Sequence, residues 1–167
     1  AIYQALLPYR SSTIWLAISG GVDSMVLLHA AHHVHDGNLK IIHIDHQLNP
    51  ESNSWADFVS EEGEKFHLHT VSCKVNCTKA EASARNARYQ CILQHVDHRD
   101  IIVTAHHLND QYETFIHRAF RGSSLKGLLG IPAQSDLQGR VLLRPLLNID
   151  QKTILHYAQQ HQIAHID

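Results

Sequence analysis

The sequence contains few of the features that mark membrane, secreted or metal-stapled proteins. Its longest apolar runs fall far short of the roughly 20 residues that span a bilayer, and no secretory signal opens the 167-residue chain, which starts at Ala1. Only three cysteines are present, Cys73, Cys77 and Cys91, and none forms a C-x-x-C pair. We therefore expect three plain thiols in a cytoplasmic protein, and no disulfide scaffold, zinc knuckle or dithiol redox site.

The chain also lacks a dominant charge. Fourteen Lys and Arg against sixteen Asp and Glu give a net charge of −2, and the pI is about 6.8, whereas a freestanding nucleic-acid binder usually has a basic face and a high pI. Positive charge is concentrated in residues 118–167, so a nucleic-acid partner would need further contacts from elsewhere. The sixteen histidines are scattered without a compact ligand set, and we expect surface and core roles for them.

Two common nucleotide-binding motifs are absent. No G-x-x-x-x-G-K-[ST] occurs, which argues against a P-loop NTPase. No G-x-G-x-x-G follows a strand-like run, which disfavours a nicotinamide-binding domain. A nucleotide site in this chain must use a different loop.

Apolar runs of strand length alternate with segments of helical periodicity along the chain. Strands are expected at 13–18, 40–46, 67–73, 100–105 and 141–143, and helices at about 25–31, 54–66, 79–95, 109–120 and 151–160. Residues 122–139, which contain Gly, Ser and Pro, are expected to form a long loop. The pattern predicts one α/β domain over residues 1–167, with a doubly wound, mainly five-stranded parallel sheet and helices on both faces.

The hexapeptide Ser19-Gly20-Gly21-Val22-Asp23-Ser24 joins the first expected strand to the first helix. Adjacent glycines allow positive φ and close approach of backbone N–H groups to a ligand, and a helix N-terminus favours a phosphate. Asp23 adds a carboxylate that suits Mg²⁺, and the two serines add hydroxyl donors. A glycine turn with ordinary helix caps is the alternative for Gly-Gly alone, but the full hexapeptide in this context favours a pyrophosphate site.

Three further polar motifs accompany the later elements. Residues 43–48 end the second strand, residues 81–89 lie on the long helix, and residues 104–114 join the fourth strand to its helix. Ligands of doubly wound sheets bind at the carboxyl ends of the strands, where the first and third of these motifs fall. Taken alone, the arginines among them fit a solvated or ion-paired helix face better than a phosphate site, whereas for the acids a helix-dipole role is the weaker of the two interpretations.

Together with Arg121-Gly122-Ser123 and Arg144-Pro145-Leu146-Leu147, these motifs resemble the tRNA(Ile)-lysidine synthetase family of N-type ATP pyrophosphatases, in order and over nearly the whole chain. That family has a Rossmann-like, adenine nucleotide alpha hydrolase-like fold. The resemblance implies that ATP adenylates the C2 oxygen of the wobble cytidine in an isoleucine tRNA with a CAU anticodon, releasing pyrophosphate. The ε-amine of free L-lysine then displaces AMP and forms lysidine.

The resemblance also implies roles for individual residues. ATP and its pyrophosphate would be bound by Ser19, Gly20, Gly21, Val22, Asp23, Ser24, His43 and Asp45, with Mg²⁺ reaching Asp23 through the pyrophosphate. Catalysis would use Asp23, Arg85, Arg88, Asp110 and Glu113, and the last two would also bind lysine. The tRNA would be bordered by Arg118, Arg121 and Lys126.

The chain departs from the family pattern in two places. Asn109 stands where the family usually has the first of two adjacent acids, so we expect Asp110 to carry the role. The sequence ends at Asp167, where the family continues into C-terminal tRNA-binding domains. Activity of this part alone, the manner of tRNA discrimination and the choice between monomer and homodimer therefore stay open.

Other functions remain as alternatives. A PP-loop tRNA thiolase typically needs C-x-x-C pairs, which this sequence lacks, and an amidotransferase synthetase needs a glutaminase domain. A non-catalytic adenine-nucleotide-binding module would bind ATP without releasing pyrophosphate. These alternatives differ from the leading hypothesis in their reaction products.

Overall fold

The computed structural model describes residues 1–45, 52–74, 89–122 and 129–166. The helices are α1 (Ile2–Leu6), the 3-10 turn η1 (Leu7–Tyr9), α2 (Val22–Val34), α3 (Ser52–Lys65), a helix over residues 89–95, α5 (Leu108–Phe120) and α6 (Gln151–Gln160). The strands are β1 (Ile14–Ala17), β2 (Leu39–Asp45), β3 (His69–Lys74), β4 (Ile101–Val103), β5 (Gln134–Leu137) and β6 (Arg140–Leu143). All five expected strands are therefore confirmed, with shifts of one or two residues at their ends.

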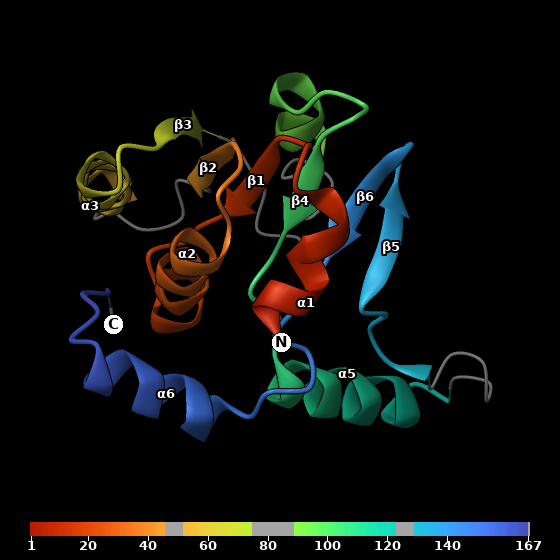
Figure 1. Ribbon diagram of the computed structural model, residues 1–167. Coiled ribbons are helices and arrows are strands. Elements are labelled where there is room, and N and C mark those ends of the chain that lie inside the picture. The colour runs from red at the N-terminus through yellow and green to blue at the C-terminus, as the bar shows by residue number, and fades with distance from the viewer. Residues whose placement is uncertain (46–51, 75–88, 123–128, 167) are drawn as a thin grey trace.

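The strands form one sheet in the order β3-β2-β1-β4-β6-β5 (Figure 1). The first five of these are mutually parallel, as predicted. The sixth, β5, pairs antiparallel with β6 and lies inside the stretch that we expected to be a loop, so that expectation is wrong for residues 134–137. A two-residue turn makes the hairpin, because Gln138 and Gly139 both have positive φ (50° and 83°), the backbone that matches the twist of paired strands.

Residues of β1, β2, β4 and β6 enter two separate cores, one on each face of the sheet. In β1, Ile14 and Leu16 pack into the larger core with α1 and α2, while Trp15 packs on the opposite face. The helix over residues 89–95 covers that opposite face, and α6 packs on α2 (Figure 1). Strands buried on both faces explain why their sequences are apolar without alternation.

Arg140 fixes the helix over residues 89–95 to the sheet. Its side chain is buried, and its Nε and Nη2 atoms donate to the carbonyl oxygens of Val96 (2.6 Å) and Leu93 (3.3 Å). These carbonyls belong to the helix end, where backbone acceptors have no partner within the helix. The guanidinium therefore supplies the missing donors and holds this helix against β6.

Two of the three cysteines are joined, contrary to our expectation of three plain thiols. Cys73 on β3 and Cys91 on the helix over residues 89–95 form a disulfide, with their Cα atoms 6.5 Å apart. The pairing depends on how this helix packs across the sheet, which cysteine spacing does not reveal. Cys77 lies outside the described residues.

Within the described ranges, none of the helices combines the length and apolar character that crossing a membrane requires.

Candidate functional site

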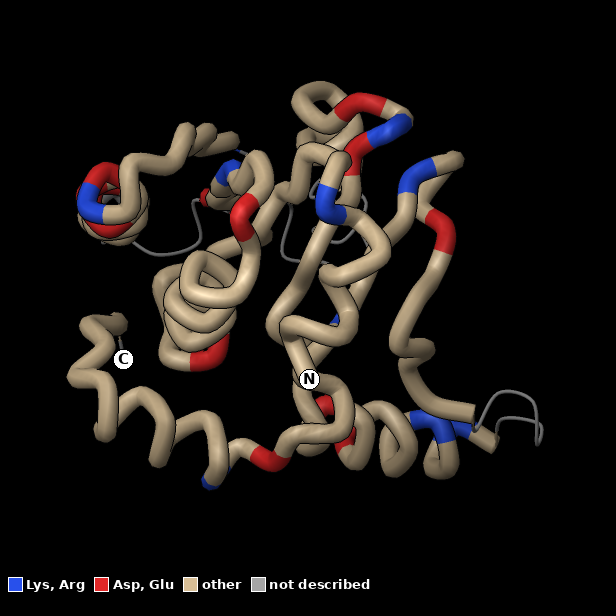
Figure 2. Tube along the Cα trace, in the orientation of Figure 1, with Lys and Arg blue, Asp and Glu red and all other residues tan. Residues whose placement is uncertain are grey.

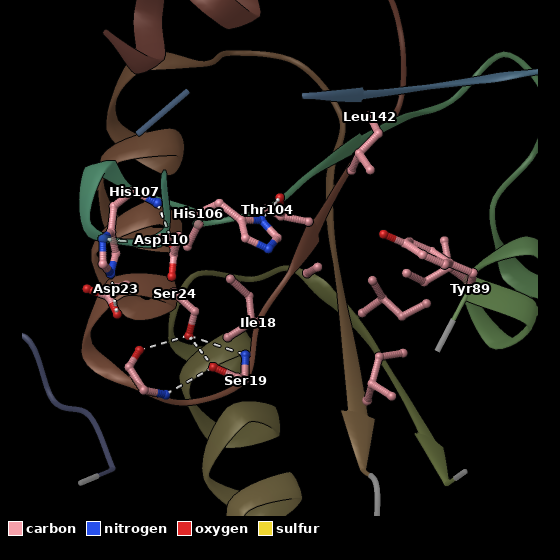
Figure 3. Close-up of a pocket in the computed structure, with 16 residues that line it drawn as sticks. Ile18, Ser19, Asp23, Ser24, Tyr89, Thr104, His106, His107, Asp110 and Leu142 are labelled. Carbon is pink, nitrogen blue, oxygen red and sulfur yellow. Dashed lines mark hydrogen bonds and ion pairs between the residues drawn. The ribbon is translucent and has the colours of Figure 1, made fainter. Parts of the chain in front are cut away.

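A cavity of about 330 Å³ opens where β1 and β4 end (Figure 3). Its polar side is formed by Ser19, Gly21, Asp23 and Ser24 after β1, and by residues 104–107 and Asp110 after β4. Its apolar side is formed by Ala17, Ile18, Ile42, Ile44, Tyr89, Ile92 and Leu142. A pocket with one apolar wall and one wall of converging polar groups is the usual form of a small-ligand site, and it lies at the strand ends where doubly wound folds bind ligands.

Ser24 organises the loop between β1 and α2. Its Oγ atom accepts from the backbone N–H groups of Ser19 and Gly20, both at 3.2 Å, and donates to the carbonyl of Gly21 at 2.8 Å. The hydroxyl of Ser19 lies 3.1 Å from Ser24 Oγ and accepts from Gly21 N–H (Figure 3). The loop is thus held in one shape at the N-terminus of α2, where the helix dipole favours an anion.

Gly20 adopts a backbone conformation that other residues rarely tolerate. Its φ is +97°, and a Cβ added there would meet Ile166 Cδ1 at 2.9 Å. The carbonyl of Gly20 accepts from Ile166 N–H at 2.9 Å, so the last described residue is bonded to the loop. Both the backbone conformation and the packing therefore require glycine at position 20.

His107 connects the two polar halves of the pocket. Its Nδ1 accepts from Asn109 N–H at 3.2 Å, which leaves the Nε2 hydrogen to face Asp23 Oδ2 at 3.5 Å. Asp110 Oδ2 accepts from His107 N–H at 2.8 Å. The three side chains form one polar row across the pocket, and Figure 3 shows them pointing toward one another.

The second carboxylate oxygen of Asp23, Oδ1, can bind a ligand. Oδ1 of this carboxylate is buried and has no hydrogen-bond partner among the described residues. A buried carboxylate oxygen without a donor is costly, and a hard cation such as Mg²⁺ prefers such an oxygen ligand. The residues present therefore fit Mg²⁺ beside the loop between β1 and α2, with Asp23 as its protein contact.

Asp110 and Glu113 occupy different environments. Asp110 is half-buried, lines the cavity and closes a reciprocal cap with His107 at the start of α5. Glu113 is exposed on α5 and does not line the cavity. Asn109 points elsewhere, because its Oδ1 accepts from Gln151 N–H (3.3 Å) and joins the starts of α5 and α6.

Three other residues that we predicted to bind the nucleotide, His43, Asp45 and Val22, do not line the cavity. His43 is buried, and its Nδ1 donates to the carbonyl of Ile18 at 2.9 Å, just before the loop. Asp45 is buried at the end of β2. Val22, the first residue of α2, packs against the larger core.

Two of the three predicted tRNA residues, Arg118 and Arg121, lie at the far end of α5 from the cavity. Arg118 is half-buried and donates to the carbonyl of Gly130 at 3.0 Å, and Arg121 is exposed at the helix end. Figure 2 shows this end of α5 as a basic spot, while the start of the helix is acidic. Arg85, Arg88 and Lys126 lie outside the described residues.

Sequence reasoning missed several cavity residues. His107 stood within the motif at residues 104–114 without an assigned role. A histidine shortly after a buried strand in this fold indicates a residue of the ligand site. Thr104 and His106 also line the cavity and are paired, with Oγ1 of Thr104 2.8 Å from Nδ1 of His106. Tyr89 lines the opposite wall.

Comparison with known proteins places the chain in a family. The sequence profile of the PP-loop domain matches residues 1–167. The chain belongs to the PP-loop domain family. The loop at residues 19–24, in which the N–H groups of Ser19 and Gly20 donate to Ser24, is the segment that we predicted to bind pyrophosphate.

Relatives of this PP-loop domain with similar sequences are named tRNA(Ile)-lysidine synthase. The protein from Haemophilus ducreyi is 39% identical over 161 residues, which cover 95% of this chain and 37% of the relative. The protein from Coxiella burnetii is 34% identical over 165 residues, covering 94% and 37%. The chain thus spans a little over a third of the length of the curated relatives it matches, about 37%.

Solved structures share the fold of this PP-loop domain. The U34-tRNA thiolase NcsA from Methanococcus maripaludis, solved with its [4Fe-4S] cluster, superposes with a TM-score of 0.76 at 15% identity, covering 99% of this chain and 62% of that one. The NH3-dependent NAD synthetase from Campylobacter jejuni has a TM-score of 0.62 at 11% identity, covering 97% and 69%. Likeness at these identities establishes the predicted α/β architecture alone.

Proposed function

We propose that this chain is the ATP-using catalytic domain of a tRNA(Ile)-lysidine synthetase. The observation that carries the proposal is the meeting, in one cavity, of the pyrophosphate loop at residues 19–24 with Asp110 from α5, through His107. The names of the relatives, tRNA(Ile)-lysidine synthase, support the same reaction. ATP, lysine and tRNA are cytoplasmic, so we place the protein in that compartment.

In the first proposed step the C2 oxygen of the wobble cytidine attacks the α-phosphate of ATP, and pyrophosphate leaves. The first N–H groups of α2, which have no partner within the helix, would bind the departing group in the fixed geometry that the loop imposes, which stabilises its charge without reorganisation. Asp23 would hold Mg²⁺, which when bound neutralises part of that charge. The apolar wall with Tyr89 and Ile92 gives the adenine or the cytidine a surface against which to pack.

In the second proposed step the ε-amine of free lysine attacks the activated C2 carbon and AMP leaves. The incoming ammonium must lose a proton before it can act as a nucleophile. Asp110 lies on the cavity wall, and its carboxylate can hold the ammonium and accept that proton. Glu113, one turn further along α5 and exposed, would extend the lysine site toward solvent.

The remaining proposed contacts lie outside the cavity. Arg85 and Arg88 are proposed to meet phosphate or the activated cytidine, and Arg118, Arg121 and Lys126 to border the tRNA. The domain over residues 1–167 would depend on C-terminal domains for tight tRNA binding. The oligomeric state of the whole protein, monomer or homodimer, is measured separately by analytical ultracentrifugation.

The test is incorporation of radiolabelled lysine by the full-length protein into an isoleucine tRNA transcript with a CAU anticodon. A transcript with uridine at the wobble position is the matched control and should accept no lysine. We expect Asp23→Asn to reduce both lysine incorporation and ATP–pyrophosphate exchange about 100-fold. Asp57→Asn, at an exposed position on α3, should leave both unchanged.

Asp110→Asn separates the two steps. The amide oxygen can still accept from His107 N–H, so the helix cap is kept. We expect the KM for lysine to rise about tenfold while tRNA-dependent pyrophosphate exchange stays within about twofold. ATP binding without tRNA-dependent exchange in the full-length protein would instead indicate a non-catalytic nucleotide-binding module.

A further inference from the structure

The disulfide between Cys73 and Cys91 lies beside the cavity and has no part in the proposed reaction. Cys73 is near the end of β3, and Cys91 is on the helix over residues 89–95. Both are buried in the core that also contains Trp15 and Ile42. The bridge therefore crosses from the sheet to the helix that covers this face.

The two sulfurs have a third polar neighbour. One ring nitrogen of His95 and the two Sγ atoms all lie within 4.8 Å of one another, and His95 is exposed. Cys91 and His95 are four residues apart on one helix, so they share a face. An imidazole this close can accept a thiol proton through one bridging water, and a thiolate is the reactive form of cysteine. His95 also connects the buried sulfurs with the surface.

Each end of the bridge is next to a residue that lines the cavity. Ile92 follows Cys91 in the helix, and Tyr89 lies two residues before it. On the sheet, Cys73 pairs with Ile44 of the neighbouring strand, which lines the same wall. A covalent link between these two ends fixes the apolar wall of the cavity relative to the sheet.

We propose that Cys73 and Cys91 form a reversible dithiol–disulfide site that hydroperoxides oxidise. The disulfide form raises the affinity of the neighbouring cavity for ATP. His95 takes the proton of one thiol, the thiolate attacks hydrogen peroxide, and a sulfenic acid and water form after proton return. The second thiol then attacks the sulfenic sulfur, giving the disulfide and a second water. Two thiols lose two electrons in total and one peroxide gains them.

Reversibility follows from the compartment proposed above. Disulfides in reducing compartments are usually transient and serve catalysis or redox sensing. Dithiol reductants would return the pair to two thiols by exchange. The effect on ATP affinity rests on the ATP site of the proposed function but not on the tRNA reaction, so it is tested without tRNA.

The first experiment maps the pair in the full-length protein. The reduced protein is treated with a small excess of hydrogen peroxide, the remaining thiols are alkylated, and the peptides are analysed by mass spectrometry before and after dithiothreitol. We expect a Cys73–Cys91 cross-linked peptide that disappears on reduction, with Cys77 alkylated in both states as the internal control. Alkylation of all three cysteines after peroxide, or a bridge to Cys77, would overturn the proposal.

The second experiment tests the role of His95. His95→Gln should slow peroxide-driven bridge formation about tenfold. The final yield of bridge should be unchanged. An unaltered rate in this variant would remove His95 from the step.

The third experiment measures ATP affinity by calorimetry in the two redox states. We expect ATP to bind about threefold more tightly to the oxidised protein, because a preorganised wall loses less freedom on binding. Cys73→Ser and Cys91→Ser should each give one affinity whatever the redox state. Equal affinities in the two states of the natural protein would refute the link to the cavity. Stoichiometric zinc on the reduced protein, lost in Cys91→Ser, would replace a redox site with a metal site.

Discussion

The Nε2 atom of His107 lies 3.5 Å from Oδ2 of Asp23, across the cavity between the loop at residues 19–24 and the start of α5. Because Nδ1 of the same ring accepts a backbone N–H, the tautomer that places a hydrogen on Nε2 is the one that fits. The ring therefore orients the carboxylate that we propose to hold Mg²⁺. One side chain both caps α5 and positions a group from α2.

His107→Ser separates these two roles. Serine is a good N-cap, so the free energy of unfolding should stay within about 0.5 kcal/mol of the natural protein. It cannot reach Asp23, so we expect ATP with Mg²⁺ to bind about tenfold more weakly by calorimetry. His107→Ala should lose the same affinity and a further ~1 kcal/mol of stability.

His156→Ala is the matched control for these variants, since His156 is exposed on α6. It should change neither stability nor affinity. Unaltered ATP affinity in His107→Ser would show that the ring does not position Asp23.

Gly20→Ala should damage the pyrophosphate loop for two separable reasons. The left-handed φ of +97° disfavours any side chain, and the new Cβ would meet Ile166 Cδ1 at 2.9 Å. We expect a loss of about 2 kcal/mol in the free energy of unfolding by urea denaturation, with weaker ATP binding.

The double variant Gly20→Ala/Ile166→Ala relieves the contact but not the backbone conformation. It should recover part of the stability lost by Gly20→Ala, relative to Ile166→Ala alone. Full recovery would mean that only the contact matters, and no recovery would assign the whole effect to φ.

The histidine-rich contact between α2 and α6 should make stability depend on pH. His29 Nδ1 lies 3.1 Å from Tyr157 Oη, and its ring stacks on that of His33. Burial lowers the pKa of His29 below its ordinary 6.5, and His33, His161 and His32 lower it further. The folded state therefore resists a proton that the unfolded state accepts, so stability is present above pH 6.5 and is lost as the pH falls through the lowered pKa.

We expect Tm to fall between about pH 7.5 and pH 5.5, and His29→Gln to reduce that fall. His35, whose pKa is also lowered by burial, would cause part of the fall in Tm that remains in the His29→Gln variant. Differential scanning calorimetry at constant ionic strength is the measurement. A steeper fall in the variant would contradict the assignment.

Asn109 provides a test of the departure from the family pattern. Its Oδ1 accepts from Gln151 N–H, and the carboxylate introduced by Asn109→Asp would keep that acceptor while adding negative charge near two helix N-termini. We expect stability to stay equal or rise by about 0.5 kcal/mol. Asn109→Ala should lose about 1 kcal/mol. Lysine incorporation that rises in Asn109→Asp would assign the missing acid a direct part in the reaction.

The fold and the site were predictable to different degrees from the sequence. Strands such as Ile14–Ala17 are buried on both faces, and an unbroken apolar run signals that environment directly. The antiparallel strand Gln134–Leu137 has no such run, because it is an edge strand that is only half covered and depends on the turn at Gln138. Its pairing is a tertiary property that a local pattern does not contain.

In the candidate site, too, local motifs could be predicted from the sequence and contacts between distant segments could not. The loop at residues 19–24 is one continuous motif, so its shape and position could be predicted. His107 acts through a partner far away in the sequence, and the bridge from Cys73 to Cys91 depends on which helix packs over β3. Such relationships arise from packing, which fixes distances between segments that the chain itself leaves independent.

The position of β1 in the sheet has a consequence for synthesis on the ribosome. Ile14 pairs on one side with Leu39, which is made soon afterwards, but on the other side with Ile101. Until residues 101–103 emerge, one edge of this apolar strand has no partner and is open to pairing with other chains. Late closure of a central strand slows folding and exposes the nascent chain to aggregation, so the yield of this domain should depend on chaperones that shield such edges during translation.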